Sequence, residues 1–311
     1  MKVVVLGATG FLGSNLVSAL LERGDRVLAF SPERDKLEVL KGLGVETFEG
    51  DFLRPETLKL PMEGTDWLVH LASTTSPLES VVDPERDGAN LTASRAVFRR
   101  AVDAGVRRIL FSSSGGTVYG DAGRSPISET AETRPVVPYT RTKLAIESEL
   151  LKMCEGTPTV PLILRFGNPY GPNQSPARGT GVVTAWLRAA RDDEPIVVYG
   201  SRKSARDFFY VSDAVRAMLM SLEGENARGI YNIGSGKATT LDEMLATIEA
   251  VTGRRLRVKE SESRRSDVVK TIALDSSKAM RDFGWKPLVS LEEGLRLTWE
   301  WVLAGEPFRV G

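Results

Sequence analysis

The chain has 311 residues, a length at which α/β enzymes commonly carry a second lobe, and 41% of its residues are hydrophobic. Its 41 Lys and Arg residues balance 41 Asp and Glu residues, so charge gives no reason to expect nucleic acid or an anionic membrane surface as a partner. Cys154 is the one cysteine and His70 the one histidine. An intramolecular disulfide, a thiolate cluster and a site of several histidines are therefore excluded, and we expect no metal.

The first residues read as a strand and lack the basic end, apolar run and cleavage site of a signal peptide. No apolar run approaches the ~20 residues that cross a membrane. These features predict a soluble, cytoplasmic protein.

In the first half of the chain, short apolar runs alternate with amphipathic stretches. Strands are expected at residues 3–6, 26–30, 65–71 and 107–112, and helices at 14–23 and 90–104. Strand–helix–strand order at this spacing predicts βαβ units. The fold class is therefore α/β, with a doubly wound parallel (Rossmann) sheet and helices on both faces.

After a further strand expected at 162–166, the composition and the length of the expected elements change. Residues 168–181 are rich in Gly, Pro, Asn and Ser and are expected to form a loop. Shorter elements follow, with helices expected at 182–191, 212–222, 240–252 and 291–303 and strands at 196–199 and 255–259. We expect a dinucleotide-binding domain at 1–168 plus about 207–234, and a smaller, interleaved C-terminal substrate lobe at 169–206 and 235–311.

A glycine-rich loop, GATGFLG at residues 7–13, joins the first strand to the first helix. Gly7 allows a tight turn, Gly10 leaves room for a pyrophosphate, and Gly13 lets the helix pack closely on the strand. The free N–H groups of the helix N-terminus, which begins with Phe11 and Leu12, favour phosphate there. The loop predicts a dinucleotide site.

The second strand should end in the group that recognises the adenosine ribose. An Asp or Glu there binds both ribose hydroxyls and repels a 2′-phosphate. This chain has Ser31 at the tip, without a charge, and Arg34 and Lys36 could meet a 2′-phosphate. Glu33 would favour NAD instead if its carboxylate points toward the ribose. We expect NAD or NADP as the cofactor, with NADP favoured by Ser31 and Arg34.

Two further strand ends lie beside the expected cofactor path. Asp51 and Phe52 close the third strand and are candidates for contact with the adenine. Leu71, Ala72 and Ser73 close the fourth strand and are also candidate cofactor-binding residues.

The segment YTRTK at 139–143 is the candidate for chemistry. Residues four apart share a helix face, so Tyr139 and Lys143 can point into one site. A free tyrosine has a pKa of ~10. A nearby cation can lower it by ~1–3 units, into the range useful for proton transfer with a sugar hydroxyl or ketone. Lys143 is also a candidate for binding the nicotinamide ribose.

Together these segments resemble the extended short-chain dehydrogenase/reductase family, in its NAD-dependent epimerase/dehydratase group of nucleotide-sugar enzymes, which includes UDP-galactose 4-epimerase. The resemblance covers nearly the whole chain. Besides the glycine loop it rests on HLAS at 70–73, Asn90, SSSGGTVYG at 112–120, PYTRTK at 138–143, RFGNPYGP at 165–172, RDFFYVSD at 206–213, YNIGSG at 231–236, RRSDV at 264–268 and DSSKAMRDFGWKP at 275–287. It implies a homodimer that pairs helices starting near Asn90 and Tyr139, and it adds Asn90 to the cofactor-binding candidates.

The resemblance implies that Tyr139 is the acid/base and Lys143 its activator, with a serine or threonine bonded to the reacting oxygen. The epimerase pattern has one residue between the third serine and Thr-Val-Tyr-Gly, whereas this chain has Gly115 and Gly116. Aligned from the strand, the hydroxyl is that of Ser114. Aligned from the later motif, the position falls on Gly115, and Thr117 is the second candidate.

The resemblance also implies a substrate site in the second lobe. Asn168 is expected to bind the substrate diphosphate, which Arg206 and Arg264 clamp, and Tyr199 lies where the family packs the nucleotide base. Guanidinium groups suit this role because they bind phosphate oxygens bidentately.

The expected function is NAD(P)-dependent hydride transfer on the sugar of a nucleotide-sugar. The family's dehydratases and decarboxylases usually carry an acid just after the catalytic threonine, where this chain has glycines. A nucleotide-sugar 4-epimerase is favoured, and an NADPH-dependent nucleotide 4-keto-sugar reductase is the alternative. A non-catalytic NADP-sensing or binding protein is a lesser one, which the intact Tyr139 and Lys143 disfavour.

Overall fold

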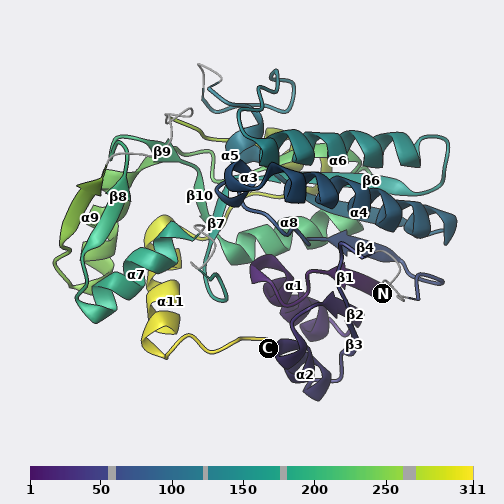
Figure 1. The fold of residues 1–311 in the computed structure, drawn as a ribbon, viewed down its shortest axis with the longest axis horizontal. Coiled ribbons are helices and arrows are strands. Elements are labelled where there is room, and N and C mark those ends of the chain that lie inside the picture. Colours follow the sequence, from purple (N-terminus) through teal and green to yellow (C-terminus); the bar gives the residue numbers. More distant parts are fainter. Residues whose placement is uncertain (55–60, 122–124, 176–180, 262–270, 311) are drawn as a thin grey trace.

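Seven parallel strands form the central sheet of the computed structural model. The structure, drawn in Figure 1, describes residues 1–54, 61–121, 125–175, 181–261 and 271–310. The strand order is β11-β6-β5-β4-β1-β2-β3, and every neighbouring pair is parallel. The strands are β1 Lys2–Leu6, β2 Arg26–Ser31, β3 Glu46–Glu49, β4 Trp67–His70, β5 Arg108–Ser114, β6 Val160–Phe166 and β11 Gly229–Ile233. The predicted doubly wound α/β fold is confirmed.

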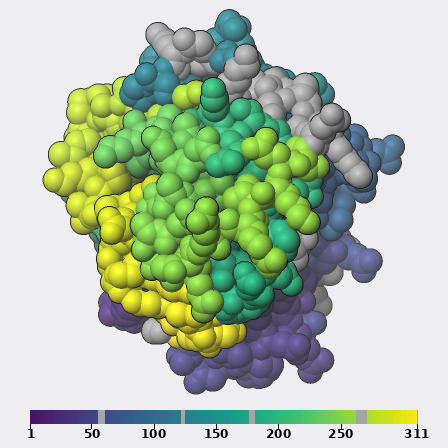
Figure 2. Space-filling view, turned by 90° about the vertical axis from the view of Figure 1, so that its left-hand side faces the viewer, coloured from purple at the N-terminus to yellow at the C-terminus, as the bar shows by residue number. Residues whose placement is uncertain are grey.

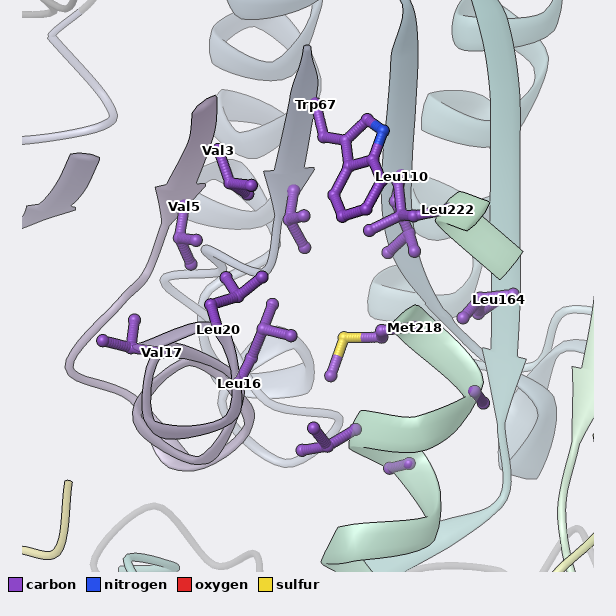
Figure 3. Packing of buried hydrophobic residues seen from close by; sticks show 14 of the residues in the cluster. Val3, Val5, Leu16, Val17, Leu20, Trp67, Leu110, Leu164, Met218 and Leu222 are labelled. Atoms are coloured by element: carbon purple, nitrogen blue, oxygen red, sulfur yellow. The ribbon is translucent and has the colours of Figure 1, made fainter. Parts of the chain in front are cut away.

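Helices cover both faces of this sheet because successive strand side chains point to opposite sides. Val3 and Val5 pack on the face covered by α1 (Phe11–Glu22), α2 (Arg34–Gly42) and α8 (Val211–Glu223), as Figure 3 shows for α1 and α8. Val4 and Leu6 pack on the face covered by α4 (Pro84–Asp103) and α6 (Pro138–Cys154). Within the described ranges, no helix has both the length and the apolar character needed to span a bilayer.

A second hydrophobic cluster organises the smaller lobe, which faces the viewer in Figure 2. It joins the helices α7 (Val182–Asp192), α9 (Leu241–Thr252) and α11 (Leu291–Leu303) to the parallel pair β8 (Ile196–Tyr199) and β13 (Val258–Ser261). Two short strand pairs complete this region, β7 (Asn168–Tyr170) with β10 (Phe208–Tyr210) and β9 (Ala205–Arg206) with β12 (Thr239–Thr240). The residue boundaries expected for the two domains stay a prediction.

The C-terminal segment returns from α11 to the first lobe (Figure 1). The backbone of Arg309 exchanges hydrogen bonds of 2.8 and 3.0 Å with the side chain of Asn173, which also donates to Ser14 Oγ at 3.0 Å. The ammonium of Lys36 on α2 lies 5.5 Å from the ring centroid of Phe308. The C-terminal segment therefore contacts α2 directly and α1 through Asn173.

Three sequence expectations need correction. The helix expected from Asn90 begins at Pro84, because the carboxylate of Asp83 accepts a hydrogen bond from Arg86 N at 3.1 Å and proline suits a first helical turn. The third strand ends at Glu49, so Asp51 and Phe52 follow it rather than close it. The expected loop at 168–181 contains β7, whose residues pair with β10.

A buried polar network joins α6 to the sheet. Arg165 of β6 donates from Nη2 to Glu147 Oε2 at 2.6 Å and from Nε to Glu147 Oε1 at 3.0 Å, and both residues are buried. Ser113 of β5 also donates to Glu147, and Arg165 Nη1 donates to Tyr119 Oη at 2.9 Å. Tyr119 in turn donates to Asn232 of β11 at 2.6 Å. The network thus connects three neighbouring strands to one helix.

Replacing Arg165 with methionine should lower the free energy of unfolding by about 3–5 kcal/mol, because Glu147 would keep a buried charge without its cation. Urea denaturation measures the change. The matched control is Arg134→Met, which removes an arginine from an exposed pair with Glu132 and should have little effect. Equal losses in the two variants would contradict the role of the buried pair.

Candidate active site

The glycine loop lies where the carboxyl ends of β1 and β4 meet the start of α1. A Cβ atom at Gly13 would lie 2.0 Å from Gly7 O, and one at Gly7, whose φ is +80°, would lie 2.9 Å from Ala72 N. Gly7 and Gly13 are therefore required by close backbone packing. Gly10 is exposed and is the N-cap of α1, so the helix start is open to an anion. This geometry fits a dinucleotide pyrophosphate.

The residues beside the loop differ in what they can offer a cofactor. Phe11 and Leu12 form the first turn of α1, and their side chains pack partly buried against the substrate-lobe core. Ala72 and Ser73 are half-buried just beyond β4, and Leu71 N donates to Leu6 O at 2.9 Å, which holds this strand end beside β1.

Asp51 and Phe52, which follow β3, differ in their exposure to solvent. Asp51 is exposed and accepts a hydrogen bond from Leu53 N at 2.9 Å. Phe52 is buried and its ring centroid lies 5.1 Å from that of His70. Burial lowers the pKa of His70 to about 3, and its Nε2 bonds to Ser94 Oγ at 2.9 Å. A histidine that stays neutral in the core fits a structural role.

The tip of β2 forms a small polar cluster. Ser31 is buried, and its hydroxyl lies 2.5 Å from that of Thr9, which donates to Glu33 Oε2 at 2.5 Å. Glu33 therefore directs its carboxylate toward the glycine loop, where Lys36 also pairs with it at 2.8 Å. Arg34 is exposed at the first position of α2.

Tyr139 and Lys143 share one face of α6, as their spacing predicts. Lys143 is buried, donates to Ser112 O at 2.9 Å, and lies 5.5 Å from the ring centroid of Tyr139. The predicted lowering of the tyrosine pKa is wrong for this arrangement. Burial, with a smaller contribution from Asp87, raises the pKa of Tyr139 above its usual value, and burial lowers that of Lys143 to about 8. Desolvation outweighs the attraction to the cation.

The two candidate hydroxyls lie together. Ser114 ends β5, Thr117 lies in the single-turn helix α5 (Gly115–Val118), and their oxygens are 2.9 Å apart. A Cβ atom at Gly115 would lie 2.4 Å from Leu274 Cδ1 and 2.8 Å from Arg165 O. The glycine that departs from the epimerase pattern is thus a packing requirement, and both hydroxyls remain candidates.

Asn90 lies in the middle of α4, and its side chain is buried. It accepts hydrogen bonds from Thr74 N at 3.0 Å and Thr74 Oγ1 at 3.1 Å, and donates to Thr75 Oγ1 at 3.2 Å. It therefore holds the loop that follows β4. One turn earlier, Asp87 accepts from Thr75 Oγ1 at 2.5 Å. The sequence reasoning missed Asp87, although its i, i+3 spacing from Asn90 puts both on one helix face.

The expected substrate residues are only partly brought together. Asn168 Oδ1 is buried without a hydrogen-bond partner among the described residues, and a Cβ at Gly116 would lie 3.3 Å from it. Asn168 N donates to Asp207 O at 2.7 Å, so the residue after Arg206 is held beside it.

The other two described substrate candidates take no part in this contact. Arg206 donates to Ala205 O at 3.0 Å, and Tyr199 is 65% exposed at the end of β8. Arg264 lies outside the described residues.

The model of the NAD dependent epimerase/dehydratase family matches residues 3–234. The chain belongs to this family. It is 31% identical over 302 residues to the dTDP-4-dehydro-6-deoxyglucose reductase of Escherichia coli, covering 94% of this chain and 95% of the relative.

Two solved epimerases have a very similar fold. The UDP-glucose 4-epimerase of Thermotoga maritima with UDP-glucose superposes with a TM-score of 0.92 at 31% identity, covering 98% of this chain and 99% of that one. The Thermus thermophilus UDP-glucose 4-epimerase in complex with NAD gives a TM-score of 0.88 at 30% identity, with coverages of 96% and 98%.

In this member of the family, Gly10→Ala should weaken NAD binding about tenfold or more, a loss of about 1.4 kcal/mol. The added methyl group has space in the protein, with Gly7 O at 3.3 Å as its one near neighbour, but it projects into the anion site. Fluorescence titration with NAD measures the change. Gly88→Ala, whose Cβ would meet nothing within 4 Å, is the matched control. Unchanged NAD affinity in Gly10→Ala would contradict this placement of the pyrophosphate.

Proposed function

We propose that the protein is a nucleotide-sugar 4-epimerase that uses NAD. The observation that carries this proposal is the grouping of a Tyr139–Lys143 pair, bonded to the β5 backbone at Ser112, with the hydroxyl pair Ser114–Thr117 that ends the same strand. The similarity to two solved UDP-glucose 4-epimerases supports the choice of reaction.

In this proposal each group acts on one oxygen of the sugar. NAD, when bound, supplies the acceptor and donor of the hydride. Tyr139 Oη takes the proton from the C4 hydroxyl and returns it, while Ser114 or Thr117 donates a hydrogen bond to the same oxygen. The Lys143 ammonium, close to the tyrosine ring, offsets part of the penalty that burial places on the Tyr139 phenolate.

The proposed substrate is a nucleoside diphosphate sugar. The buried amide oxygen of Asn168 lies beside the Ser114–Thr117 turn and has no hydrogen-bond partner among the described residues. Arg206 immediately precedes Asp207, whose carbonyl accepts from Asn168 N. With Arg264, these residues are proposed to hold the diphosphate, and the exposed ring of Tyr199 is proposed to pack on the base. Guanidinium forks match the charge and geometry of phosphate oxygens.

Tyr139→Phe should lower turnover about 10²–10⁴-fold, because it removes the group that transfers the proton, while NAD still binds. Interconversion of UDP-glucose and UDP-galactose, followed by chromatography, measures the effect. Tyr210→Phe is the matched control, since it removes the hydroxyl of a tyrosine in the core of the smaller lobe but keeps the ring, and it should retain turnover. Full turnover in Tyr139→Phe would contradict the mechanism.

A 4-keto-sugar reductase is the second candidate. The uncharged Ser31 and the exposed Arg34 lie at the end of β2, where the adenosine ribose is expected, and they favour NADPH. The Escherichia coli relative is a reductase. Such an enzyme takes up reduced cofactor for each turnover and releases it oxidised, whereas an epimerase recycles a bound cofactor.

Glu33 supports NAD over NADP. Its carboxylate accepts a hydrogen bond from Thr9 beside the glycine loop, and a carboxylate at this corner binds ribose hydroxyls and repels a 2′-phosphate. The direction of Glu33 was open in the sequence, and the direction seen here supports NAD, whereas Ser31 and Arg34 alone support NADP.

Glu33→Gln should raise the affinity for NADP relative to NAD about tenfold, because it removes the repelling charge. Titration of the purified protein with each cofactor measures the ratio. Glu38→Gln, an exposed change on the same helix, should leave the ratio unchanged. A wild-type protein that already prefers NADPH, and that is purified without bound NAD, would instead support the reductase.

The homodimer is also a proposal. Its support is that α4 and α6 pack on the same face of the sheet and present adjoining outer surfaces, where Arg95 pairs with Glu149 at 2.9 Å. These are the two helices that the family resemblance pairs with their copies.

A further inference from the structure

Asp87 is a fully buried carboxylate that the proposed mechanism does not use. It lies on α4 with none of its surface exposed. Oδ1 accepts a hydrogen bond from Thr75, whereas Oδ2 is buried and has no hydrogen-bond partner among the described residues. Burying a charge in this way is costly unless another group compensates it.

Asp87 lines the same small cavity as Tyr139 and Lys143. Asp87, Asn90, Tyr139 and Lys143 line this cavity together with the strand end at Ala72 and Ser73. Its volume is about 10 Å³, close to the lower limit for one water molecule. Because both residues are buried, Asp87 and Lys143 act on each other through a medium of low dielectric constant.

The other charged or titratable groups around Lys143 are already engaged. Glu147, one turn later on α6, is bound by two nitrogens of Arg165. His70 on β4 is neutral because burial keeps its pKa near 3. On the β5 side, Lys143 meets the Ser112 carbonyl and the Phe111 ring, which carry no charge. In the part of the chain that the structure describes, Asp87 has no cation of its own.

We propose that Asp87 is a positioning residue of the active site, whose buried carboxylate is the counter-ion that keeps Lys143 protonated and held against Ser112 O. It acts through Lys143 and does not touch the sugar. The catalytic meaning of this pairing rests on the proposed function, but the pairing itself does not.

The sign of its effect follows from charge. A nearby anion favours the ammonium form of lysine, so it opposes the burial that lowers the pKa of Lys143. The same anion disfavours the phenolate of Tyr139. The loss of the carboxylate should therefore move the protonation of both groups to lower pH. A residue that only supports the fold would move neither.

The test is a titration of Lys143 in the intact protein, compared with Asp87→Asn. Protein with ¹³C-labelled lysine gives a pH-dependent Cε resonance for each lysine, and the Lys143 signal is assigned by its absence in Lys143→Arg. We expect a midpoint near pH 8 in the wild type and a fall of about one pH unit in Asp87→Asn. An unchanged or higher midpoint would overturn the proposal.

Two further variants control for structure. Asp103→Asn makes the same chemical change at an exposed position of α4 and should leave the midpoint unchanged. Asp87→Ser, which is smaller, serves if the asparagine variant does not fold, and it should show the same fall. If both Asp87 variants fail to fold, Asp87 primarily stabilises α4 and the proposal is overturned.

Activity gives a separate readout. The alkaline limb of the pH profile for UDP-glucose and UDP-galactose interconversion should move down with the Lys143 midpoint in Asp87→Asn. A shifted midpoint in a protein that turns over neither sugar would support the Asp87–Lys143 pairing and reject the proposed substrates. A shifted activity limb without a shifted midpoint would overturn the pairing.

Discussion

The buried ion pair between Arg165 and Glu147 fixes α6, the helix of Tyr139 and Lys143, on the sheet. Glu147 lies one helical turn after Lys143, so the contact that holds it to β6 also sets the position of Lys143 against β5. Ser113, which donates to the same carboxylate, stands between the Ser112 carbonyl that Lys143 binds and the Ser114 hydroxyl. A pair of charges that is expensive to bury thus determines where three polar groups of the active site lie.

Desolvation is the second constraint on this site. The segment that carries Tyr139 and Lys143 is packed so closely that burial raises one pKa and lowers the other, away from the values that proton transfer needs. Proximity of the two residues is not sufficient to reverse this, because each loses water on folding. For Lys143 the compensation comes from the nearby carboxylates of Asp87 and Glu147, which raise its pKa against the effect of burial. Asp87 adds to the effect of burial on the pKa of Tyr139.

Most of the fold could be predicted because its signals are local. The apolar runs and the glycine spacing located the strands, the helices and the phosphate loop, and the four-residue spacing correctly put Tyr139 and Lys143 on one face. What could not be predicted depends on side-chain direction or on distant contacts. The direction of Glu33 depends on its hydrogen bond with Thr9, and glycine is required at position 115 because Leu274 packs against it. That one carboxylate oxygen of Asp87 lacks a hydrogen-bond partner among the described residues becomes visible only when its surroundings are known. Arg264 lies in a segment outside the described residues.

The return of the C-terminal segment has a mechanical consequence. The backbone of Arg309 is bonded to Asn173, whose side chain also bonds to α1 at Ser14, and Phe308 lies under Lys36 of α2. Lys36 in turn pairs with Glu33 at the start of α2. Any rotation of the smaller lobe must therefore either pull on α1 and α2 or break these contacts. Movement of the smaller lobe and movement of α1 and α2 are thus linked through the last few residues of the described chain.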